Sequence, residues 1–162
     1  MTYLTTTAPY VTFDGRDGGD IYQKDPSGQR VPRFAVDKSS SKAKNIYRIM
    51  PDGSRAEFAS ASTSSLSGKT KVSLQGTQIT LDPSWEGLQY RVEVRGTPMG
   101  DLRWKPSSSF GHELRLEDAK GAALAEYKRS GKDLTVAIFV QGDDFLIDLI
   151  MACAVSLNGK IS

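Results

Sequence analysis

The basic side chains between positions 24 and 55 are the residues of this chain best suited to bind another molecule. This segment holds eight lysines and arginines against three aspartates, a local charge of +5, so the net charge of +2 leaves −3 for the rest. Lys42 and Lys44 stand two residues apart, and in an extended strand they project the same way. Charge runs are often plain solvated faces, but this one predicts an anion site. Its predicted members are Lys38, Lys42, Lys44 and Arg48.

Catalytic residue patterns are missing from the sequence. The one histidine, His112, follows a serine-rich loop at Ser107, Ser108 and Ser109. A serine nucleophile needs a base and an orienting acid, and no nucleophile elbow or other catalytic motif accompanies these residues. The loop is therefore better explained as a plain turn region. We expect a protein that is not an enzyme.

Metal and nucleotide motifs are equally weak. One histidine and one cysteine cannot form a zinc site, and Asp143-Asp144 lacks the spaced oxygen ligands of a calcium loop. The glycines of DGRDGG match no nucleotide-binding loop, so they indicate a turn. We expect neither a metal nor a cofactor.

The most apolar stretch, Phe145 to Leu157, indicates a buried helix. Its 13 residues include two polar ones. As a helix they would cover roughly 20 Å, too little for a bilayer core of about 30 Å. A helix that is apolar nearly all round is buried on all sides. Asp143 or Asp144 can cap its start and Asn158-Gly159 can stop it, so we expect a helix over about 144–157 and no membrane span.

Short alternating segments between turn signals fill the rest, and they predict about twelve strands over about 3–140. We expect the first strand over Tyr3 to Phe13 and a loop at DKSSSKAK. A sheet of this size closes to remove its edges, and roughly eight strands already give a filled lumen. A wider barrel needs a plug, which the helix supplies. The predicted fold is mainly β, a closed antiparallel barrel around a buried C-terminal helix, in one domain over 1–162.

Two residues of this helix carry chemistry of their own. An ionised Asp148 inside an apolar plug would cost several kcal/mol unless paired. We expect it either to face a barrel mouth or to accept hydrogen bonds from backbone amides at the positive end of the helix dipole. Lys160 and the strand arginines are candidate partners, and a pH-sensitive or ligand-facing acid in the lumen is the functional alternative. Cys153 lies in the most apolar part and is expected to be a chemically quiet packing residue.

The amino-acid composition indicates the class of protein and its cellular location. With 38% hydrophobic and 25% charged residues, the chain is an ordinary globular one. A net charge of +2 gives no reason to expect nucleic acid as a partner. The absence of a signal-peptide pattern and the single cysteine predict an intracellular protein, cytoplasmic or peripheral to a membrane.

The order of elements resembles the tubby C-terminal-like superfamily, which includes tubby proteins, phospholipid scramblases and LURP-one-related proteins, and many small fungal proteins. GHELRLED, ALAEYKR, LTVAIFV and DDFLIDLIMACAV resemble the closing part of these domains, and FLIDL is similar to the scramblase end. SSSKAKNIYRIMPDG resembles the basic hairpin that tubby proteins use against phosphoinositide head groups.

The resemblance implies a non-enzymatic intracellular module that binds a membrane surface peripherally. Its basic face around 38–48 would contact anionic phospholipid head groups, such as those of phosphoinositides. One alternative is a protein-interaction domain in stress or defence that binds no lipid. Another is a small-ligand carrier that uses a barrel cavity beside the helix.

Overall fold

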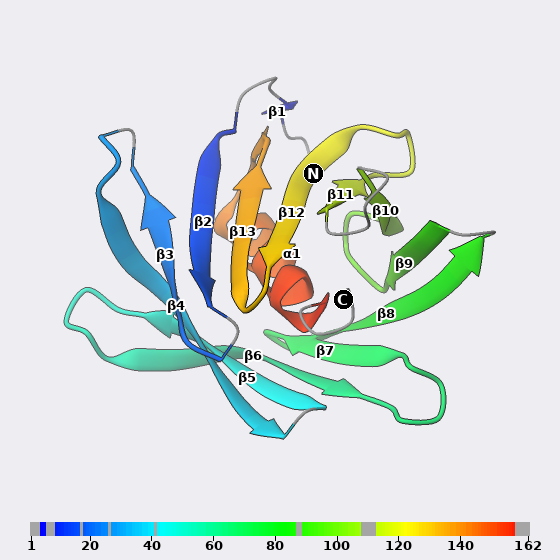
Figure 1. Cartoon of the computed structure of the whole chain (residues 1–162), viewed down its shortest axis with the longest axis horizontal. Coiled ribbons are helices and arrows are strands. Elements are labelled where there is room, and N and C mark those ends of the chain that lie inside the picture. Colours follow the sequence, from blue (N-terminus) through cyan, green and yellow to red (C-terminus); the bar gives the residue numbers. More distant parts are fainter. Residues whose placement is uncertain are drawn as a thin grey trace.

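The structure, a computed structural model, describes residues 4–5, 9–16, 18–25, 27–40, 42–86, 89–107 and 113–157. Its main feature is a closed barrel of twelve strands, each antiparallel to both neighbours (Figure 1). Strands adjacent in the chain are adjacent in the barrel, and β13 pairs with β2 to close it. The barrel strands are β2 (Val11–Arg16), β3 (Asp20–Lys24), β4 (Arg30–Ser40), β5 (Ala43–Ile49), β6 (Arg55–Thr63), β7 (Thr70–Leu74), β8 (Thr77–Glu86), β9 (Gln89–Arg95), β10 (Leu102–Pro106), β11 (Glu113–Glu117), β12 (Ala123–Ser130) and β13 (Asp133–Ile138).

Alternating burial along the strands separates a dry interior from a wet exterior. In β7, Thr70, Val72 and Leu74 are buried, whereas Lys71 and Ser73 are exposed. The same period of two places one face of each strand toward the lumen. The predicted mainly β, closed antiparallel barrel is confirmed.

The helix α1 (Asp144–Leu157) occupies the interior of this barrel (Figure 1). Its start is capped by Asp143, whose Oδ1 accepts a hydrogen bond from the Leu146 amide at 3.0 Å, which leaves fewer amides unsatisfied. Every residue from Asp148 to Leu157 is buried, because strands surround the helix. The predicted enclosed helix is confirmed, while the expected stop at Asn158-Gly159 lies outside the described residues. No helix in the described ranges combines the length and hydropathy of a membrane span.

The beginning of the chain corrects one strand prediction. The expected single strand from Tyr3 to Phe13 is divided into β1 (Leu4–Thr5) and β2, and β1 pairs with β14 (Val140–Gln141). Pro9, between β1 and β2, has no backbone amide to donate to a ladder. The short β1–β14 sheet lies at the end of the barrel where α1 begins (Figure 1).

The segment DKSSSKAK is a second correction, because most of it is strand rather than loop. Strand pairing continues from Lys38 opposite Lys44 to Ser40 opposite Ala43, with a bulge between Lys38 and Ser40. The hairpin tip is therefore short. This changes which of its lysines point outward.

Candidate functional site

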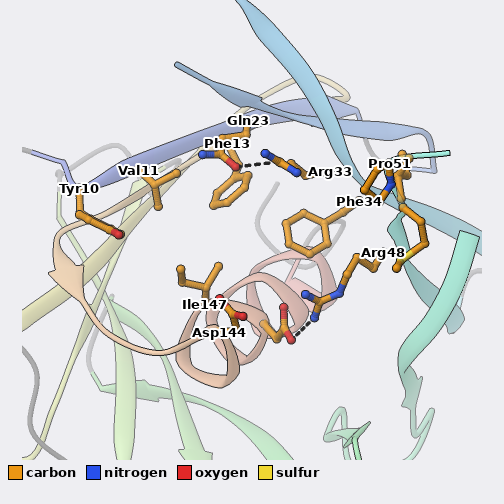
Figure 2. Close-up of a pocket in the computed structure, with 13 residues that line it drawn as sticks. Tyr10, Val11, Phe13, Gln23, Arg33, Phe34, Arg48, Pro51, Asp144 and Ile147 are labelled. Atoms are coloured by element: carbon orange, nitrogen blue, oxygen red, sulfur yellow. Dashed lines mark hydrogen bonds and ion pairs between the residues drawn. The ribbon is translucent and has the colours of Figure 1, made fainter. Parts of the chain in front are cut away.

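A pocket of about 500 Å³ opens at the barrel mouth where α1 begins (Figure 2). Its apolar walls come from Phe13 of β2, Phe34 of β4 and Ile147 of α1. The rings of Phe13 and Phe34 meet edge to face with centroids 5.4 Å apart, an arrangement favoured by the ring quadrupoles. Tyr10 and Met50, both exposed, also line the pocket. The pocket thus offers apolar surface close to water.

Charged groups are set into these apolar walls. Arg33 projects from β4 and donates through Nε to Oε1 of Gln23 at 2.9 Å, which orients the guanidinium. Asp144, the first residue of α1, is exposed and lies on the helix side of the pocket. Figure 2 shows Arg33 beside the phenylalanine rings and Asp144 across the hollow near Ile147.

A second pair of charges forms the inner wall of the pocket. Arg48 of β5 donates from Nη2 to Oδ2 of Asp148, whose side chain is 3% exposed against 35% for Arg48. Gln75 Nε2 donates to the same oxygen at 3.2 Å, and the Arg48 guanidinium carbon lies 5.4 Å from the Phe58 ring centroid. Of the candidate partners of Asp148, a strand arginine binds it, and Lys160 lies outside the described residues. Asp148 faces a barrel mouth, one of the two expected arrangements.

Gln75 reaches Asp148 from a tight hairpin turn. Leu74 pairs with Thr77, and both intervening residues, Gln75 and Gly76, have positive φ angles of 49° and 83°. A non-glycine residue in this conformation costs on the order of 1 kcal/mol. The turn therefore holds Gln75 where its amide can bind the buried carboxylate.

Burial raises the pKa of the Asp148 carboxyl above its ordinary value. The positive charge and hydrogen bond of Arg48 and the hydrogen bond of Gln75 oppose this shift, while the negative charge of Asp144 adds to it. Loss of hydration disfavours the charged form. Asp148 is thus a largely buried acid that its partners hold at the inner wall of the pocket.

Two members of the predicted anion site, Lys44 and Arg48, are instead bound to α1. Lys44 is 7% exposed, and its Nζ donates to the carbonyl of Val155 at 2.7 Å, near the end of α1. Arg48 is the partner of Asp148. The position of Ile46 explains this, because Ile46 points inward and residues two apart in a strand share a face. That alternation was a sequence signal for the inward placement of Lys44 and Arg48.

Lys38 and Lys42 are exposed near the tip of the β4–β5 hairpin, at the barrel end opposite the pocket. The Nζ of Lys42 donates to Ser65 Oγ in the β6–β7 loop. The four predicted residues therefore do not form one site. Elsewhere in the basic segment, Arg30 pairs with Asp14 at 3.2 Å and Arg55 with Asp20 at 3.2 Å, so part of the +5 charge is neutralised.

The residues considered for catalysis or metal binding contribute no site in the described part of the chain. His112, Ser108 and Ser109 lie outside the described residues. Cys153 is 1% exposed, and burial raises its pKa to about 12. In the ranges that the structure describes, no three His, Cys, Asp or Glu side chains gather closely enough to hold a metal ion.

Several residues that line the pocket were not predicted as binding residues from the sequence. Phe13 and Phe34 belong to different strands, and no local spacing relates either to α1. Arg33 was counted only for its charge, and Asp144 was considered only as a possible helix cap and, with Asp143, as a possible calcium ligand. Their meeting depends on closure of the barrel and on the position of the helix within it.

Comparison with known proteins gives a match at the level of the fold. A scan against protein-family models and a search of curated proteins each find no match. Among solved structures, the chain is similar to the X-ray structure of the AT5G01750 protein from Arabidopsis thaliana. The sequences are 14% identical, the alignment covers 93% of each chain, and the TM-score is 0.55. The likeness therefore spans nearly the whole barrel.

Proposed function

We propose that this protein is a non-enzymatic binding barrel whose ligand, a small amphiphilic molecule, occupies the pocket at the barrel mouth. The observation that carries the proposal is the meeting of Phe13, Phe34, Arg33 and Asp144 around one hollow of about 500 Å³. Ligand pockets have volumes of roughly 300–1,000 Å³ and combine apolar walls with a few polar groups. The pocket has both properties.

The mouth suits a ligand better than the lumen does. The helix fills the lumen, where Leu149, Ile150 and Ala152 are fully buried. The small-ligand hypothesis placed the ligand in a cavity beside the helix, and the pocket lies beside its first two turns. A ligand can enter there without displacing α1.

We further propose that the protein is a tubby-like barrel. The closed twelve-strand barrel, the enclosed C-terminal helix and the similarity to the Arabidopsis thaliana protein support this. The sequence strings that resemble tubby and LURP-one-related domains point the same way. The intracellular location predicted from the sequence remains part of this proposal.

A pocket-filling substitution tests the proposed site. The probe is the dye anilinonaphthalenesulfonate, an aromatic anion whose fluorescence rises in apolar surroundings. Val11→Trp fills the pocket, and Val31→Trp is the matched control because Val31 is exposed and does not line it. We expect titrations to show dye binding by wild type and by Val31→Trp, and binding at least about ten-fold weaker by a folded Val11→Trp. Equal dye binding by all three would refute the proposed site.

A second candidate function is peripheral contact with an anionic membrane through the opposite end of the barrel. The hydrogen bond from Lys42 to Ser65 brings the β4–β5 tip to the β6–β7 loop, where the Lys69 side chain is 50% exposed and forms an ion pair with Asp82 at 3.9 Å. Exposed lysines near an anionic surface contribute roughly 1 kcal/mol each. Lys38 and Lys42 are the members of the sequence-predicted head-group site that remain outside the barrel.

A protein-interaction role without lipid is the third function. Membrane contact through the lysines predicts salt-dependent retention on anionic vesicles, whereas this role predicts none.

A further inference from the structure

The charges that face the pocket differ in their freedom to meet a ligand. Arg48 and Asp148 bind one another, so their charges largely cancel. In the ranges that the structure describes, Arg33 makes one hydrogen bond, from Nε to Gln23, and the Nη side of its guanidinium is available to a ligand. Within the described residues the Asp144 carboxylate has no hydrogen bond or ion pair with a side chain. The pocket therefore presents one cation and one anion.

These two charges lie on different walls, separated by apolar surface. Arg33 belongs to β4 and Asp144 to the first turn of α1. Figure 2 shows the rings of Phe13 and Phe34 and the side chain of Ile147 around the space between them. A molecule that spans the pocket would meet a guanidinium, an apolar surface and a carboxylate.

We propose that the ligand of this pocket is a zwitterionic amphiphile, with its anionic group on Arg33, its cationic group on Asp144 and an apolar portion against Phe13 and Phe34. This inference rests on the proposed function and adds the charge of the ligand. Arg33 can donate two hydrogen bonds to a carboxylate or phosphate, and Asp144 can accept from an ammonium group.

Charge complementarity favours this class over singly charged ligands. A simple anion would satisfy Arg33 and bring a second negative charge toward Asp144. A simple cation would satisfy Asp144 and bring a second positive charge toward Arg33. Like-charge juxtaposition and unpaired desolvated charges both penalise the wrong ligand. A zwitterion satisfies both groups and adds no net charge to the mouth.

The experiment compares four probes with one chain length: ω-aminooctanoate, octanoate, octylamine and octanol. Isothermal titration with the full chain gives their dissociation constants, and an exposed ion pair is worth up to about 1 kcal/mol, or roughly five-fold in affinity. We expect ω-aminooctanoate to bind about five-fold more tightly than octanoate and octylamine. Octanoate or octylamine binding as tightly as ω-aminooctanoate overturns the zwitterion inference and leaves the proposed pocket standing. If none of the four binds, both fail.

Two variants assign the ends of the probe. Arg33→Gln should weaken ω-aminooctanoate binding about five-fold and leave octylamine unchanged or improved. Asp144→Asn should likewise weaken ω-aminooctanoate binding about five-fold and leave octanoate binding unchanged or improved. Asp143 still caps the helix in this variant. The controls are Lys71→Gln and Asp101→Asn, exposed residues outside the pocket. Unchanged ω-aminooctanoate binding in both pocket variants would overturn the assignment of Arg33 and Asp144.

The charges of a phosphatidylethanolamine head group are only two carbons apart, whereas Arg33 and Asp144 lie on different walls separated by apolar surface, so the pocket favours a free molecule with charges at both ends over a lipid head group. Co-sedimentation with phosphatidylethanolamine vesicles, with and without excess ω-aminooctanoate, distinguishes the sources. Retention that the soluble probe competes away supports a head group in the pocket. Absence of retention, with the soluble probe bound, assigns the pocket to a free molecule.

Discussion

Arg48 of β5 donates a hydrogen bond to the buried carboxylate of Asp148, and it thereby fixes α1 to one strand of the barrel. Four residues earlier, Lys44 of the same strand donates to the Val155 carbonyl. Four strand steps cover about 13 Å and seven helical steps about 10.5 Å, so the two contacts match in length. β5 thus runs opposite to α1 and holds it at both ends. Lysine near the last carbonyls also complements the helix dipole.

The pair between Arg48 and Asp148 should be costly to break from one side. Among the described residues, Arg48→Met leaves the buried carboxylate with Gln75 as its side-chain partner, and we expect a loss of about 3 kcal/mol in the free energy of unfolding. Replacing both partners, Arg48→Met with Asp148→Leu, should recover most of it, because no unpaired charge remains. Urea unfolding measures both variants.

The matched control for that experiment is Arg30→Met. Arg30 forms an ion pair with Asp14 in which both side chains are largely or partly exposed, at 47% and 31%. Such pairs contribute less than about 1 kcal/mol. Equal losses for Arg30→Met and Arg48→Met would show that the buried pair has no special role.

Titration of Asp148 should contribute to the pH dependence of the free energy of unfolding. Burial raises the pKa of this carboxyl in the folded state, so the folded protein binds the proton more tightly than the unfolded chain. Stability from this group is therefore present below the unfolded value of about 3.9 and is lost as pH rises through the folded pKa. As pH rises from about 3.9 through the folded pKa of Asp148, the free energy of unfolding of wild type should fall relative to that of Asp148→Asn. A difference that is constant or grows in favour of wild type as pH rises would contradict this.

How far the sequence predicted this barrel depends on whether a signal is local. Turn residues and strand alternation are local, so the number of barrel strands and their antiparallel direction were predictable. The apolar circumference of the helix required an enclosure, and the barrel supplied it. The division of the first expected strand was missed, since pairing of Leu4 with Gln141 joins distant parts of the chain.

The enclosed helix should make its core residues sensitive to truncation. Leu149→Ala should cost about 2 to 5 kcal/mol, because the surrounding strands cannot collapse into the cavity. Leu66→Ala is the control, since Leu66 is fully exposed and should change stability by less than about 0.5 kcal/mol. Thermal or chemical unfolding compares them. A loss below about 1 kcal/mol for Leu149→Ala would place the helix in a looser environment than the one described.

Cys153 should be unreactive until the protein unfolds. Burial raises the pKa of its thiol to about 12, and the thiolate is the reactive form. A thiol reagent should therefore label native protein slowly and denatured protein rapidly at neutral pH. Labelling at the same rate in both states would contradict the buried position.

The binding residues were harder to predict than the fold. A charge count treats every lysine in a strand alike, yet the two faces of β5 have opposite environments. Ile46 identifies the inner face and assigns Lys44 and Arg48 to it, whereas Lys42 precedes the strand and stays outside. The pocket residues come from five elements, β2, β3, β4, β5 and α1, and only their packing brings them together.

The proposed membrane contact can be tested by comparing the exposed Lys38 and Lys42 with the buried Lys44. If the outer end of the barrel contacts an anionic surface, Lys38→Ala with Lys42→Ala should weaken binding to phosphoinositide vesicles by about 30-fold, at roughly 1 kcal/mol for each charge. Stability should change little, because both residues are exposed. Lys44→Met should do the reverse: it removes a buried hydrogen bond to Val155, lowers stability by about 1 to 2 kcal/mol and leaves vesicle binding intact. Co-sedimentation at two salt concentrations measures binding, and raised salt should mimic the double substitution because exposed charges are screened. If wild type fails to sediment with vesicles at low salt, or the double variant sediments equally well, the membrane candidate is wrong.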